Sequence, residues 1–152
     1  MEIKVFSRSE TRVTLIEKAV NFYSKHLGIN KADCTVYIAP RKSMRTKEKR
    51  IGCVVRSFNF GQDHFIMRID NQLSLHRLLA VLAHEMVHVK QMIQGEIKFS
   101  KYRNGRIKHI WHGKEVRLPY HKQPWELEAY NMEVSMVNAL MKNVYKNSRK
   151  TK

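Results

Sequence analysis

The chain of 152 residues has few cysteines and few acidic residues, and it lacks any long apolar run. Its two cysteines, Cys34 and Cys53, do not form a C-x-x-C pair, which excludes a cysteine-based zinc module. Both lie in apolar, strand-like stretches, where we expect reduced thiols. The longest apolar run, residues 78–83, is far too short to cross a bilayer, and the N-terminus lacks the apolar segment of a secretory signal. We therefore expect a cytoplasmic protein that is not secreted and has no membrane partner.

Acidic residues are scarce, because 13 Asp and Glu stand against 29 Lys and Arg, and the formal net charge is +16. Such an excess suggests a polyanionic partner, nucleic acid above all, although basic charge also serves simply to keep a protein soluble. The densest basic stretch is residues 41–50, which we interpret as an exposed, mobile loop that offers phosphate contacts. The chain has no zinc-finger or RNA-recognition motif and no evident helix-turn-helix.

The remaining composition is that of one folded domain. A hydrophobic share of 43% and a charged share of 28% are typical of globular chains rather than of disordered ones. A chain of this length has room for one core but not for a second full domain. We expect a single domain over residues 1–145 and a basic disordered tail over residues 146–152.

Helical spacing of apolar residues predicts three helices. The first is capped by Ser9 and ends at Gly28, the second lies between Ser74 and Gly95, and the third begins at Pro124. Runs rich in Val, Ile and Phe predict a small sheet, with strands at residues 34–39, 52–58 and 64–70 and a further short strand at residues 2–6. Asn104-Gly105 predicts a hairpin between residues 98–102 and 106–111. The expected class is therefore α+β.

The second predicted helix carries the pattern H-E-x-x-H from His84 to His88. Residues four apart share one face of a helix, so His84 and His88 can present two imidazole nitrogens to one ion. Glu85 lies one step around the helix, where its carboxylate can reach a water on that ion without being a ligand. Two bare imidazoles on an otherwise apolar, buried helix are unfavourable, which favours a metal site over an amphipathic helix with polar edge residues.

A catalytic zinc ion takes three protein ligands, so a third must come from elsewhere in the chain. The downstream candidates are Glu126, Glu128, His109, His112 and His121. We favour Glu126, because Ala129 lies three residues later on the same helix face and a small residue there allows two helices to approach closely. Glu128 points about 200° away from Glu126, so both cannot bind from a regular helix. For either glutamate, the alternative is a carboxylate that only stabilises the helix dipole.

Together, these elements resemble the minimal zincin fold of metallopeptidases, with an N-terminal helix, a sheet of three to four strands, the H-E-x-x-H helix, a hairpin insertion and a last helix. The E-x-x-A run of that last helix resembles the gluzincin arrangement, and His84, Glu85, His88 and Glu126 match its pattern. In size and layout the chain is similar to small SprT-like and ImmA-like zincins of bacteria and phages. In several gluzincins an acidic residue follows the small one, where this chain has Tyr130.

The resemblance implies a zinc-dependent metallopeptidase, a hydrolase that attacks a protein or peptide substrate with a zinc-bound water. Glu85 would move the proton, and the oxyanion would be stabilised by His112, Tyr120, His121 or Tyr130. The substrate would lie extended along the edge strand, expected at residues 64–70. The basic charge suggests substrates associated with DNA. The competing hypothesis is a nucleic-acid-binding protein that keeps this scaffold without catalysis, and the sequence leaves the oligomeric state open.

Overall fold

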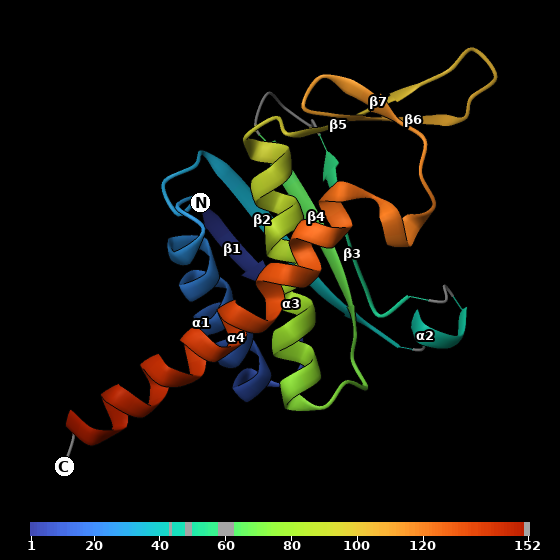
Figure 1. The fold of residues 1–152 in the computed structure, drawn as a ribbon. Helices are drawn as coiled ribbons and strands as arrows, with labels where there is room; N and C mark the ends of the chain where they lie inside the picture. The colour runs from blue at the N-terminus through green and yellow to red at the C-terminus, as the bar shows by residue number, and fades with distance from the viewer. Residues whose placement is uncertain (43, 48–49, 58–62, 151–152) are drawn as a thin grey trace.

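A four-stranded sheet and the helices packed on one of its faces form the two layers of the molecule (Figure 1). A computed structural model describes residues 1–42, 44–47, 50–57 and 63–150. The elements in chain order are β1 (Glu2–Val5), α1 (Glu10–His26), β2 (Cys34–Arg41), α2 (Met44–Lys47), β3 (Gly52–Ser57), β4 (Asp63–Asp70), α3 (Leu75–Ile93), β5 (Ile97–Lys101), β6 (Ile107–Trp111), β7 (Lys114–Val116), the 3-10 helix η1 (Tyr120–Lys122) and α4 (Pro124–Lys150). The predicted α+β class is confirmed.

The strand order of the main sheet is β1-β2-β4-β3, with β1, β2 and β4 parallel and β3 antiparallel to β4. Side chains of a strand alternate between the two faces, and on β4 every second residue, Phe65, Met67 and Ile69, is buried. The prediction that residues 64–70 form the edge strand is wrong. β4 is flanked by β2 and β3, and β3 is the edge beside α3 because, among the described residues, it pairs with β4 alone.

A second, smaller sheet has the strand order β5-β6-β7 and projects from the body of the molecule (Figure 1). The predicted hairpin at Asn104-Gly105 is confirmed, because Lys101 pairs with Ile107 and Gly105 takes the positive φ of 78° that such a turn requires. The third strand, β7, was not predicted. Its three residues are too few to give a periodic signal.

α1 and α3 begin and end where predicted, although the Ser74 side chain at the N-cap of α3 makes no capping hydrogen bond. The Ser9 hydroxyl accepts a hydrogen bond from the Arg12 backbone, and Gly28, with a φ of 70°, follows the end of α1. α4 runs to Lys150, so residues 146–150 of the expected disordered tail are helical, whereas residues 151–152 lie outside the described residues. Part of the basic stretch 41–50 is also ordered, since α2 lies within it and Met44 is buried; residues 43, 48 and 49 of that stretch are not described.

α3 is the central helix, buried on most of its surface between the sheet, α1 and α4. The Tyr23 hydroxyl of α1 donates to the Leu79 carbonyl, at 3.2 Å, and fixes α1 against this helix. His84 and Glu85 lie in the middle of α3 and are only 8% and 5% exposed. Over the described part of the chain, no helix combines the length and apolar character needed to span a bilayer.

Candidate metal centre

The structure brings His84 and His88 of α3 together with Glu126 of α4. One donor atom from each of the three lies within 4.8 Å of the others. The two histidine Nε2 atoms are 3.2 Å apart, and the Glu126 carboxylate oxygens lie 3.3 Å from His84 Nε2 and 3.5 Å from His88 Nε2. α4 packs on α3, and Ala129, one turn after Glu126 on the same face of α4, is fully buried, which suits a close approach of the two helices. The donors are those of a site that holds a metal ion with three protein ligands.

The polar atoms of this cluster fit a cation at its centre. Glu126 Oε2 is buried without a hydrogen-bond partner among the described residues, and the two facing Nε2 atoms cannot both donate to one another. Burial raises the pKa of the Glu126 carboxyl, but contacts with His84 and His88 lower it well below its ordinary value, so the carboxylate stays charged. An ion at this place would satisfy all three side chains.

Each histidine has a second partner at its Nδ1 atom. His88 Nδ1 donates to Gln91 Oε1 at 2.8 Å, whereas His84 Nδ1 lies at ion-pair distance, 3.3 Å, from Glu133 Oε2 without the geometry of a hydrogen bond. The hydrogen bond at Nδ1 favours the tautomer of His88 whose Nε2 is free to bind a metal, and the Glu133 carboxylate is close enough to favour the same tautomer of His84. Glu133 was missed in the sequence, although it lies seven residues after Glu126 and therefore on the same face of α4. Tyr130, at the position where several gluzincins have an acidic residue, packs against the His84 ring with ring centroids 4.7 Å apart.

Glu128, the second candidate for the third ligand, belongs to a supporting network. Its carboxylate accepts from Lys90 at 2.9 Å and from the Gln91 amide at 3.0 Å, and Lys90 also donates to Glu96. Glu128 thus positions the Gln91 amide, and Gln91 Oε1 in turn accepts the hydrogen bond from His88 Nδ1. The three candidate histidines also lie outside the cluster: His109 stacks on Trp125, and His112 and His121 are exposed.

Glu85 lies beside the edge strand rather than in the ligand cluster. A Cβ atom at Gly52 of β3 would be 2.8 Å from Glu85 Oε1 and 2.5 Å from Val81 Cγ1, so only glycine allows the strand to come this close. Burial raises the pKa of the Glu85 carboxyl, and although the nearby His88 and His84 lower it, the net shift is upward. The importance of Gly52 was not predicted. Its only sequence signal is a glycine at the start of a strand.

A cleft of about 850 Å³ opens over these residues, between β3 and α3 on one side and β5, β6, η1 and α4 on the other. Of the four predicted oxyanion donors, Tyr120 and Tyr130 line the cleft, whereas His112 and His121 do not. The geometry therefore defines a site able to hold one metal ion, and this site lies in an open cleft. Comparisons of the chain with protein-family models, with curated proteins and with solved structures find no match.

We expect Glu126→Ala to abolish stoichiometric zinc binding, because it removes one of three donors. Glu128→Ala should retain the metal, because Glu128 supplies no donor atom to the cluster and only supports it through Lys90 and Gln91. Elemental analysis of both purified variants after zinc loading and dialysis checks this, with circular dichroism to verify folding. Equal metal loss in two folded variants would contradict the assignment of Glu126.

The Glu133 carboxylate is expected to set the orientation of His84. Loss of such a supporting carboxylate typically lowers metal affinity by about 10–100-fold, and we expect this for Glu133→Gln. Competition with a chromogenic chelator measures the affinity directly. Glu10→Gln, which makes the same charge change at an exposed residue of α1, is the matched control and should leave the affinity unchanged.

Proposed function

We propose that the protein is a zinc-dependent metallopeptidase. The observation that carries the proposal is the convergence of His84, His88 and Glu126, with Glu85 adjacent to them but outside the donor cluster. Two histidines and a glutamate are a donor set of catalytic zinc, and the Glu85 carboxylate would supply the general base that hydrolysis requires. Since the three donors face an open cleft rather than a closed core, a substrate has access to them.

Zinc held by these side chains would supply Lewis acidity, lowering the pKa of a water molecule and polarising the carbonyl group of the substrate. Glu85 would accept the proton from that water and then donate it to the leaving amine. Burial supports this role, because it raises the pKa of the Glu85 carboxyl and so helps it to hold a proton. Burial also raises the pKa of Tyr120, and Glu126 raises it further, so its phenol stays protonated and can donate to an oxyanion.

The edge strand supports a peptide as the substrate. β3 has β4 on one side, and Gly52, Cys53 and Val54 line the cleft on the other. An extended peptide can add to such an edge through main-chain hydrogen bonds. It would then pass Glu85, which lies against Gly52.

We expect Glu85→Gln to reduce cleavage of a protein substrate by at least about 10²-fold, the usual contribution of a general base. The zinc content should not change, because Glu85 is not a donor. Cleavage of an unfolded protein, followed by gel electrophoresis and paired with elemental analysis, measures both. Unchanged cleavage by the zinc-loaded variant would show that Glu85 is not the general base. Wild-type activity that survives chelation would show that cleavage does not depend on the metal.

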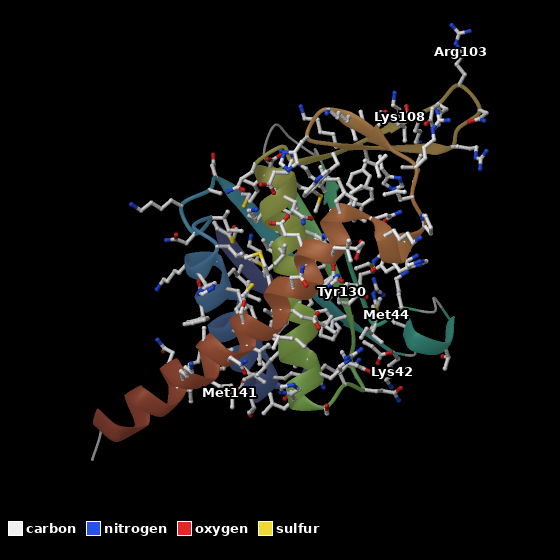
Figure 2. All side chains as sticks on the ribbon, in the orientation of Figure 1. Lys42, Met44, Arg103, Lys108, Tyr130 and Met141 are labelled. Atoms are coloured by element: carbon white, nitrogen blue, oxygen red, sulfur yellow. The ribbon has the colours of Figure 1, made fainter. Side chains whose placement is uncertain are left out.

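A second candidate function is nucleic-acid binding, favoured by the charge of the β5-β6-β7 sheet. Residues 97–117 include the acidic residue Glu115 and the basic residues Lys98, Lys101, Arg103, Arg106, Lys108, Lys114 and Arg117. Glu115 is itself paired with Lys108, at 2.9 Å, and with Arg117. Arg103 extends from the hairpin tip, away from the body (Figure 2). This surface is therefore a candidate for phosphate contacts in addition to residues 41–50.

If this sheet contacts phosphates, replacing Lys101, Arg103 and Arg106 by Glu should weaken binding to duplex and single-stranded DNA. The slope of log affinity against log salt should fall by about one for each phosphate that the variant no longer neutralises. Fluorescence anisotropy across a salt series measures the slope. The control replaces the exposed Lys18, Lys25 and Lys31 by Glu, which changes the net charge by the same amount away from this sheet. Equal effects of both variants would mean that binding depends on overall charge and not on this sheet.

A further inference from the structure

The two ends of the cleft differ in chemistry. At the end nearest the N-terminus of α3, the lining includes two basic side chains, Arg50 and Arg77. At the other end it is apolar and aromatic, with Met92, Ile97, Phe99, His109 and Trp125. The metal ligands and Glu85 lie between these ends. A cleft with these two ends favours a substrate that carries a group complementary to each of them.

Arg77 faces the cleft at its basic end. It precedes His84 by seven residues, which places it on the same helix face about 10 Å away along the axis. It is exposed in the first turn of α3, where no acidic residue is present and where a positive charge opposes the helix dipole. Helix stability therefore does not explain an arginine here. Arg50 adds to the charge, since it lies just before β3 and interacts electrostatically with Glu85.

The apolar end has a buried floor and an exposed rim. Met92, Ile97 and Trp125 are 3–4% exposed, whereas Phe99 is 54% exposed. His109 joins the rim to the floor, because it contacts Phe99 edge-on at 5.5 Å between ring centroids and stacks on Trp125 at 5.3 Å. An exposed ring beside an apolar floor gains contact area by covering a large apolar side chain.

We propose that this cleft selects extended peptides that carry a carboxylate at its Arg77 end and a bulky apolar side chain at its Phe99 end. The inference rests on the proposed function and specifies its substrate class. An extended chain advances about 3.3 Å per residue, so the carboxylate lies about three residues from the point that faces His84. Met92 is eight residues beyond His84, about 12 Å along the helix axis, which puts the apolar residue about four residues away on the other side of that point. The carboxylate belongs either to an acidic side chain or to the C-terminus of the peptide.

Peptide binding to the zinc-loaded Glu85→Gln variant tests the selectivity without cleavage. Labelled Ala-based peptides carry Asp and Phe about seven positions apart, in both orders, with amidated or free C-termini. We expect one order to bind about tenfold more tightly than its Asn and Ala counterparts in fluorescence anisotropy. If amidation removes the preference, the carboxylate is that of the C-terminus. Equal affinity for all the peptides would overturn the inference.

Charge reversal at Arg77 gives a sharper test. Glutamate suits the first turn of a helix, so Arg77→Glu should fold, and it should now favour a Lys peptide over the Asp peptide by about tenfold. The matched control is Arg68→Glu, which makes the same change at an exposed residue of β4 that does not line the cleft. The same shift in both variants, or equal weakening of every peptide by Arg77→Glu, would overturn the inference.

The inference and the proposed function can fail separately. If the zinc-loaded wild-type protein leaves its preferred peptide intact while Arg77→Glu still reverses the binding preference, the peptidase proposal fails and the selectivity of the cleft stands. If the wild-type protein cuts Asp and Asn peptides, and Phe and Ala peptides, at equal rates, the selectivity fails and the peptidase proposal stands.

Discussion

The packing of α4 on α3 is the constraint on which the site depends. His84 and His88 are placed by one helix, but Glu126 reaches them only because Ala129 allows α4 to lie directly on α3. A larger side chain at Ala129 would hold the helices apart, and the carboxylate would no longer reach either imidazole. The donor cluster is therefore a consequence of a small residue in a helix interface.

Buried polar groups strengthen the same interface. Lys90 and Gln91 of α3 both bind Glu128 of α4, and the Gln91 amide also donates to the Trp125 carbonyl at 3.0 Å. Because Gln91 is fully buried, each of these bonds would be expensive to break. The network fixes α4 at the turn that carries Glu126, so the interactions that orient His88 also position the third donor.

Much of this arrangement could be predicted from local sequence patterns. The caps at Ser9 and Gly28, the Asn104-Gly105 turn and the i, i+4 histidines depend only on neighbouring residues, and each has a direct physical signature. Strand order has no such local signature, because residues 52–57 and residues 64–70 are both apolar runs. Only tertiary pairing decides which of them is central. β4 is central because it pairs with β2 in parallel on one side and with β3 on the other.

The parts of the site that escaped prediction are those in which one element meets another. Glu133 contacts His84 only after α4 has docked, and Gly52 matters only because the start of β3 lies against Val81 and Glu85. Which strand forms the edge is more than a topological detail, because it decides which residue lies beside Glu85. With β3 at the edge, a glycine backbone borders Glu85; a strand with a side chain at that point would displace the carboxylate.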